Sequence, residues 1–227
     1  MSVLSGARCF PARARAILGA VRHNPSTVVV LAGKPGEQAL AAVGRSLNVV
    51  LVRPQEPSAA GSPGDGIGAA AGALRRAAGI SAPYVLVAAD PLNAVADAWR
   101  DMWAIGSAPG GSDEFELRAA EAPAAWRSSQ FELPDYYLVL APDAPADGAA
   151  PAADFYLGPL RSVRPNRVAV AAGREPAAQA AAVLAELGTL RHGRWWPSLE
   201  EIFRAARGFY PGALAESPAA GRATLLS

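Results

Sequence analysis

The fold is decided by residues 28–46, which read VVVLAGKPGEQALAAVGRS. Residues 28–32 form a run of aliphatic residues that predicts a strand buried on both faces. A loop with Gly33 and Gly36 follows, and about residues 36–46 are rich in alanine, which favours helix. A fully apolar strand followed directly by a helix is typical of a parallel sheet with helices on both faces.

The same alternation continues along the chain. It predicts a three-layer α/β fold with a Rossmann-like open sheet, mostly parallel, of about five core strands. We expect residues 26–212 to form this single domain. The other strands are expected at residues 48–52, 84–89, 136–141 and 167–171, and the other helices at about residues 66–79, 90–105, 176–190 and from residue 198 onward.

Two internal segments depart from the alternation. Residues 106–132 contain two acidic patches and an alternating Phe115-Glu116-Leu117-Arg118, which we interpret as an insertion with an exposed strand or hairpin. Residues 142–153 are rich in Ala, Pro, Asp and Gly and predict a mobile loop. Residues 155–157 fit either a short edge strand or a helical turn.

The ends of the chain are also distinct. Residues 1–25 contain arginines but no Asp or Glu, which fits either a short amphipathic helix or an organelle transit peptide. We therefore expect a cytoplasmic protein, or an organelle-matrix protein if this basic segment is cleaved. Residues 213–227 predict a flexible tail.

Charge and composition exclude several classes of protein. Net charge is +5 over residues 1–45, −8 over residues 46–159 and +4 over residues 160–227. This scatter lacks the dense basic stripe of a nucleic-acid binder, and no apolar run is long enough to span a membrane, so we expect neither partner and predict a soluble protein. One lysine against twenty arginines, with abundant alanine, indicates a GC-rich genome.

Few residues are available for metal binding or nucleophilic catalysis. Cys9 is the only cysteine, and His23 and His192 are the only histidines. A cysteine-rich or three-histidine metal centre is therefore excluded. No Gly-x-Ser-x-Gly motif is present to support a Ser-His-acid triad, and no cofactor motif is present.

The glycine loops suggest an anion site. Ala32-Gly33-Lys34 and Ala172-Gly173-Arg174 both follow expected strands, so both lie at the carboxyl edge of a parallel sheet, where ligands bind. Gly33, Gly36 and Gly173 would let a ligand approach the backbone, and Lys34 and Arg174 would add positive charge. The alternative is that these glycines serve turn geometry and the two cations are solvated.

Three further residues carry open alternatives. Asp90 ends the third expected strand before Pro91, so it is either a helix cap or a ligand-binding carboxylate. Trp195 and Trp196 either stack on a planar ligand or anchor the last helix. Ser198 and Glu201 have capping-box spacing, which predicts that the helix begins there.

Two functions remain open from these features. The chain is either a small-molecule-binding protein or enzyme that holds a phosphate- or carboxylate-bearing ligand at the carboxyl edge of the sheet, or a non-catalytic accessory subunit on a Rossmann-like scaffold. A protein partner of such a subunit would bind through the insertion at residues 106–132. Fold alone does not choose between the two.

Overall fold

The computed structural model describes the chain between residues 26 and 210 with several gaps. The described ranges are 26–33, 36–54, 66–103, 111–128, 130–141, 153–173, 175–190 and 193–210. The basic segment and the tail predicted at the two ends lie outside these ranges, as do residues 142–152 of the predicted loop.

Five strands form one sheet in the order β2-β3-β1-β4-β5, and every neighbouring pair is parallel. The prediction of a parallel α/β sheet is therefore confirmed. The strands lie within one to two residues of the expected positions. They are β1 (Thr27–Ala32), β2 (Val49–Val52), β3 (Tyr84–Val87), β4 (Tyr136–Ala141) and β5 (Val168–Ala172).

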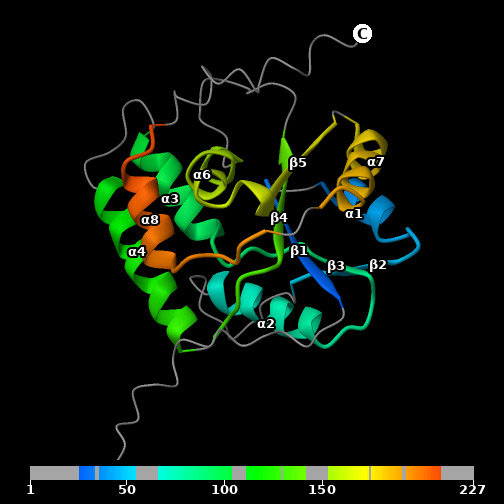
Figure 1. The fold of residues 1–227 in the computed structure, drawn as a ribbon, viewed down its shortest axis with the longest axis horizontal. Coiled ribbons are helices and arrows are strands. Elements are labelled where there is room, and N and C mark those ends of the chain that lie inside the picture. Colours follow the sequence, from blue (N-terminus) through cyan, green and yellow to red (C-terminus); the bar gives the residue numbers. More distant parts are fainter. Residues whose placement is uncertain are drawn as a thin grey trace, which may run out of the picture.

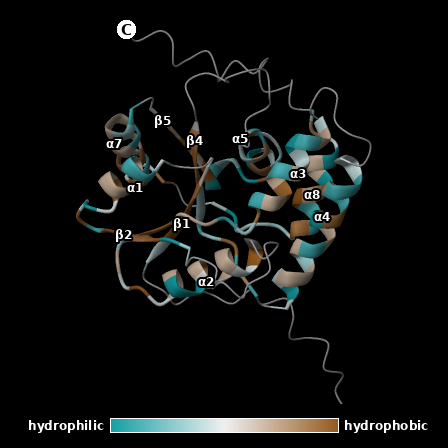
Figure 2. Ribbon diagram, turned by 180° about the vertical axis from the view of Figure 1, so that it is seen from behind, coloured by the Kyte–Doolittle hydropathy of each residue, from teal (hydrophilic) through white to brown (hydrophobic). Residues whose placement is uncertain are grey.

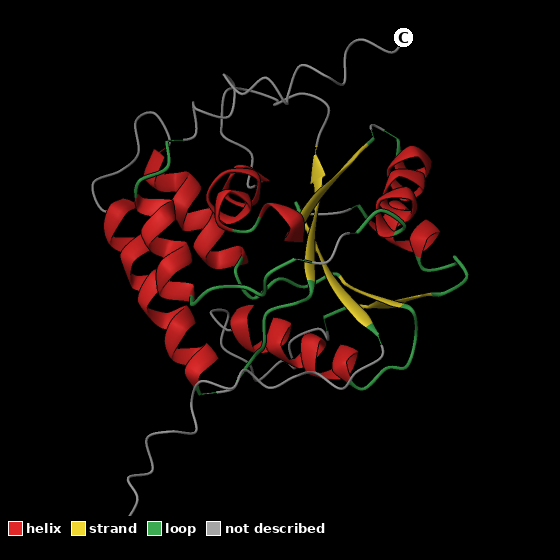
Figure 3. Cartoon of the chain, viewed as in Figure 1, coloured by secondary structure: helices red, strands yellow, loops and turns green. Residues whose placement is uncertain are grey.

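β1 is the central strand, which explains why its sequence is the most uniformly apolar. Val29 pairs with Leu86 of β3 on one side and with Tyr136 of β4 on the other. Val28, Val29 and Val30 have no exposed surface. Figure 3 shows the strands in the middle of the molecule, with helices around them.

The order of the strands determines where the helices lie. The connection from β1 to β2 passes β3 in one direction, whereas the connections from β2 to β3, β3 to β4 and β4 to β5 all run in the other direction. Because such crossovers are right-handed, the first connection lies on one face of the sheet and the other three lie on the opposite face.

The helices follow this rule. α1 (Glu37–Val43) packs against α7 (Pro176–Leu187) on one face. The other face carries α2 (Gly66–Ala78), α3 (Asn93–Trp103), α4 (Gly111–Arg127) and α8 (Leu199–Arg207). Figure 1 shows α1 and α7 together on one side of the sheet, and α3, α4 and α8 together on the other.

The two layers have different cores. The layer of α1 and α7 is built from small and aliphatic side chains such as Leu40 and Val183. The opposite layer holds the large buried aromatic side chains, among them Trp99, Phe115 and Tyr156. In Figure 2 the strands are mainly hydrophobic, while the helices of the aromatic layer, opposite α1 and α7, carry hydrophilic residues among the hydrophobic ones.

α8 closes the aromatic layer. The Ser198 side chain accepts a hydrogen bond from the Glu201 backbone N–H at 3.3 Å, which confirms the predicted cap. Leu199, Ile202, Phe203 and Ala206 are buried against the layer. The indole Nε1 of Trp99 donates to the Ala206 carbonyl at 2.9 Å, which fixes α8 against α3.

The prediction of a strand or hairpin within residues 106–132 is wrong, because residues 111–127 form the helix α4. The local alternation around Phe115 resembles a strand, but the buried positions Phe115, Ala119 and Ala122 recur at helical spacing. Arg118 bonds to Glu114 and Glu121, four residues before it and three after it, as on a helix surface.

A chain of short helices leads from β4 to β5. They are α5 (Ala153–Phe155), the π-helix η1 (Tyr156–Leu160), α6 (Arg161–Val163) and the 3-10 helix η2 (Pro165–Arg167). Of the two alternatives for residues 155–157, the helical turn is the one observed. The described residues include no helix long and apolar enough to cross a membrane.

Candidate functional site

The carboxyl edge of the sheet next to β1 is the place where the fold favours a ligand. The connection after β1 leads to α1 on one face, whereas the connections after its neighbours β3 and β4 lead to helices on the other face. Neighbouring strands whose connections diverge in this way leave a crevice at the edge between them, and ligands of open α/β sheets bind there.

Gly33 and Asp90 follow the adjacent strands β1 and β3, so the structure brings both to this edge. Gly173 follows β5, which β4 separates from β1. Strands are spaced by about 4.8 Å, so β1 and β5 lie about 10 Å apart. Lys34 and Arg174 lie outside the described residues.

Gly33 is required by the backbone. Its φ of +95° is a conformation that residues with a Cβ rarely adopt, and a Cβ at this position would lie 2.7 Å from the carbonyl oxygen of Leu140 on β4. The turn after β1 therefore packs directly on the neighbouring strand. This contact is sufficient to explain Gly33 without a ligand.

Gly173 is also explained by packing. A Cβ there would lie 2.6 Å from the backbone nitrogen of Gln179 and 2.8 Å from its Cα. The chain after β5 thus touches the first turns of α7, where Pro176 occupies the start of the helix.

Gly36 differs from both of these glycines. It is the N-cap of α1, with φ −69° and ψ 148°, and a Cβ there would meet no atom within 4 Å. Gly36 is exposed, and no side chain caps the first turn of the helix. Packing therefore does not require this glycine, and the backbone at Gly36 is open to an approaching molecule.

Asp90 points into the aromatic layer. Its Oδ1 accepts hydrogen bonds from the Leu92 backbone N–H at 2.8 Å and from the Tyr137 hydroxyl at 3.3 Å, and its Oδ2 accepts one from the Tyr156 hydroxyl. The Leu92 bond closes a turn immediately before α3. Asp90 therefore accepts a backbone hydrogen bond just before the first turn of α3, and its carboxylate also accepts hydrogen bonds from two tyrosine hydroxyls.

The environment of this carboxylate changes its acidity. Burial raises the pKa of Asp90 to about 6, although the hydrogen bonds from Tyr156, Leu92 and Tyr137 act in the opposite direction. The charge of Asp97 adds a smaller upward shift. Burial and the negative charge of Asp90 also raise the pKa of Tyr137 and Tyr156 well above its usual value.

The two tyrosine partners were not predicted from the sequence. Tyr137 lies on β4, and Tyr156 lies in η1, where the π-helical turn carries it to the carboxyl end of β3. Their only sequence signal is that they are tyrosines rather than phenylalanines within apolar stretches, since a buried hydroxyl needs a hydrogen-bond partner.

The two tryptophans near the last helix have separate roles. Trp196 is buried, and its Nε1 donates to the Pro134 carbonyl at 2.7 Å, so it anchors the segment before α8 as one of the two interpretations proposed. Trp195 is 45% exposed.

Comparison with known proteins gives no relative. No protein-family model matches the chain, and no curated protein or solved structure matches it either. Function must therefore be inferred from the site alone.

The described residues restrict the chemistry of this edge. They contain no histidine or cysteine, and they include no group of three His, Cys, Asp or Glu side chains placed to hold a metal ion. Within this part of the chain, the ionisable groups at the edge include Asp90 and its two tyrosines, as well as Glu37 next to Gly36, which forms an ion pair with Arg53 after β2.

Proposed function

We propose that this protein binds a small molecule carrying a phosphate or carboxylate group at the carboxyl edge of the sheet next to β1. The proposal rests on two observations together. The connections after β1 and after its neighbours lead to opposite faces of the sheet, and Gly36 is an exposed glycine that packing does not require. Lys34, the only lysine of the chain, lies between Gly33 and Gly36 in the sequence and would supply the cation for the anionic group.

Asp90 takes a different role in this proposal from that of an anion ligand. Its carboxylate is largely ionised at neutral pH, because its pKa is about 6, and it would repel an anion. We assign it to positioning Tyr137 and Tyr156 at the end of β3. Arg174 is a secondary contact, since its strand lies two positions from β1.

The test is a thermal-shift panel of nucleotides, sugar phosphates, coenzyme A derivatives and dicarboxylates with the full chain. A ligand at 100 times its dissociation constant stabilises the fold by about 2.7 kcal/mol. Lys34→Ala should weaken the binding of such a ligand by roughly 10- to 150-fold, the loss of one charge-assisted hydrogen bond. The melting temperature without ligand should stay unchanged.

Arg45→Ala is the matched control. Arg45 is exposed beyond the far end of α1, and removing it changes the net charge equally without touching the carboxyl edge. Equal loss of affinity in both variants, or an unchanged affinity in Lys34→Ala, would refute the role of Lys34. A panel with no stabilising ligand would refute the proposal as a whole.

The second candidate is a non-catalytic accessory subunit. It is favoured by the engagement of Asp90, the one acidic candidate at the edge, in three hydrogen bonds within the fold. In this proposal a protein partner contacts α4, on which Leu117 is 51% exposed. Leu117→Glu would then abolish association with the partner and leave the thermal-shift panel unchanged.

A further inference from the structure

β2 is an outermost strand of the sheet, and one side of its backbone faces no neighbouring strand. Within the described sheet its partner is β3, with which it pairs in parallel. The carbonyls of Asn48 and Val52 accept hydrogen bonds from backbone N–H groups of β3 and of the residue after it, at 3.2 and 2.9 Å. Because the bonding groups of successive residues alternate between the two sides of a strand, those of Val49 and Leu51 point away from β3. We call this side the β2 edge.

The free part of the β2 edge is short and symmetric. At one end the Arg53 carbonyl already accepts a hydrogen bond from an arginine of α2 at 2.8 Å. At the other end the extended conformation stops at Asn48, whose φ is +67°. The backbone N–H and C=O groups that remain for a further strand are therefore those of Val49 and Leu51, one residue on each side of Val50.

Exposed apolar side chains lie along the same segment. Val50 is 37% exposed, and Leu47, two residues before the strand, is 90% exposed. β5, the outermost strand on the other side of the sheet, carries no exposed large hydrophobic side chain. The remaining ones among the described residues lie in four separate parts of the chain, at Leu117, Leu184, Trp195 and Tyr210. Within the described chain, free backbone groups and exposed apolar side chains thus coincide at the β2 edge.

The sequence of β2 does not protect this edge. Edge strands of natural proteins usually carry a charged residue, a proline or a bulge that prevents pairing with another chain. β2 reads VVLV, and the nearest charges at its carboxyl end, Arg53 and Glu37, are paired with each other. An apolar edge strand without such a device is a template for a further strand.

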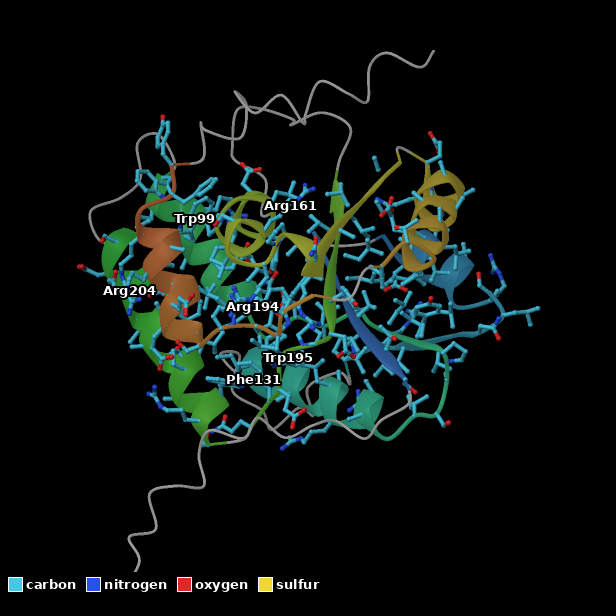
Figure 4. The ribbon with its side chains drawn as sticks, in the orientation of Figure 1. Trp99, Phe131, Arg161, Arg194, Trp195 and Arg204 are labelled. Carbon is cyan, nitrogen blue, oxygen red and sulfur yellow. The ribbon has the colours of Figure 1, made fainter. Side chains whose placement is uncertain are left out.

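The β2 edge lies apart from the aromatic layer and from the ligand site. Figures 1 and 2, which view the molecule from opposite sides, both show β2 away from α3, α4 and α8. Trp99 and Arg204, labelled in Figure 4, lie among those helices. β3 separates β2 from β1, so the backbones of β2 and β1 lie about 10 Å apart. The β2 edge is thus distinct from the carboxyl edge at β1 and from the surface of α4.

We propose that two copies of this chain pair through their β2 edges, antiparallel around a two-fold axis at Val50. In this register Val49 of each copy faces Leu51 of the other, and the two residues exchange both N–H···O bonds, so every free group of the edge is satisfied. The two Val50 residues face each other as a non-hydrogen-bonded pair, with about 4.5 Å between their Cα atoms. Their side chains cover each other, and the two five-stranded sheets become one.

The symmetry of the free edge favours a second copy over a strand of another protein. A two-fold dimer requires that the same patch complements itself. The β2 edge meets this requirement, because its free groups stand on either side of one exposed apolar residue, Val50, which then meets an identical side chain. Pairing uses up the whole free edge, so assembly stops at two copies.

The experiment measures the mass of the full chain by sedimentation equilibrium at protein concentrations from about 10 μM to about 1 mM. We expect the mass to rise from 23.3 kDa toward twice this value. Val50→Lys places two ammonium groups at the two-fold axis and should raise the dimer dissociation constant by at least about 10-fold. Leu184→Lys is the matched control, since Leu184 is 36% exposed on α7 and receives the same charged side chain. It should dimerise as the wild type does.

Hydrogen exchange of single backbone amides locates the interface in the wild type and needs no variant. The amides of Val49 and Leu51 should exchange at least about 10-fold more slowly at about 1 mM than at about 10 μM, because the second copy accepts their hydrogen bonds. The amide of Val50 is the internal reference, since it points to β3 with or without a partner. Its exchange should depend on concentration far less.

Three results would overturn the proposal. The first is a wild type that stays at 23.3 kDa at about 1 mM. The second is equal dimerisation of Val50→Lys and Leu184→Lys, which would place the interface elsewhere. The third is slow exchange at Val49 and Leu51 at every concentration, which would show that another part of the same chain covers the edge. None of these outcomes depends on Lys34 or on a ligand at the carboxyl edge.

Discussion

Replacing Asp90 with asparagine should change how the stability of the protein depends on pH. Asparagine has the same shape as aspartate, and its oxygen can accept the bonds from Leu92 and Tyr137. Its amide group can donate to the Tyr156 oxygen. The variant therefore keeps the packing at the end of β3 and removes only the titration of this carboxyl group.

The size of the effect follows from the pKa of Asp90, which is about 6 in the folded protein against 3.8 in an unfolded chain. Because the folded pKa is raised, protonated Asp90 stabilises the fold at low pH, and this stabilisation is lost as pH rises through 6. Between pH 4.5 and pH 7 the loss amounts to about 2 kcal/mol. Above pH 7 no further loss is expected.

Urea unfolding followed by tryptophan fluorescence at several pH values measures this difference. The free energy of unfolding of the wild type should fall by about 2 kcal/mol more than that of Asp90→Asn between pH 4.5 and 7. The other carboxyl groups, including Asp97 and Asp154, are present in both proteins and cancel in the comparison. Parallel curves for the two proteins would show that Asp90 titrates as an exposed aspartate, which would refute its enclosure by Tyr137 and Tyr156.

Two stability predictions concern the two edges of the sheet. Arg167→Lys should destabilise the fold by about 2–4 kcal/mol in urea unfolding, since lysine cannot reach the three carbonyls that Arg167 bonds; a loss below ~1 kcal/mol would contradict its role. Gly33→Ala should cost about 2 kcal/mol or more because of its positive φ and its contact with Leu140, whereas Gly36→Ala should cost less than about 1 kcal/mol. Equal melting temperatures for the two alanine variants would argue against the turn geometry at Gly33.

The strands were predictable because each is a short apolar run with turn residues on both sides. A run such as residues 28–32 needs no long-range information to be identified, and the intervening helices imply parallel pairing. The strand order was not predictable. The placement of β1 between β3 and β4 depends on contacts between residues more than 50 positions apart, such as Val29 with Leu86 and Tyr136.

The error at residues 106–132 has a local cause. Four residues that alternate between apolar and polar fit a strand and a helix surface equally well, and only the longer spacing from Phe115 to Ala119 and Ala122 distinguishes them. Alanine is small, so its burial is a weak signal in a sequence with so much of it. The packing of α4 against α3 and α8, which connects residues far apart in the chain, accounts for the burial of these positions.

The candidate site was predictable in position but not in detail. The sequence placed Gly33, Asp90 and Gly173 at strand ends, and all three lie at the carboxyl edge. It did not distinguish Gly33, which the fold requires, from Gly36, which it does not. The partners of Asp90 lie 47 and 66 residues away in the chain, beyond the range of any local pattern.

The topology directs the two groups of predicted site residues at this edge toward opposite faces of the sheet. The first crossover takes the chain from β1 to the layer of α1 and α7, so Gly33 and Gly36 lead toward α1. The next crossover past β1 takes the chain from β3 to the aromatic layer, so Asp90 turns toward Tyr137 and Tyr156. Under the proposed function, the ligand would contact the backbone at Gly36, and Asp90 would hold the two tyrosines. Asp90→Asn tests whether Asp90 is structural or binds the ligand. If Asp90 is structural, a ligand found in the thermal-shift panel should bind this variant as tightly as it binds the wild type. A large loss of affinity would place the Asp90 carboxylate in the binding site.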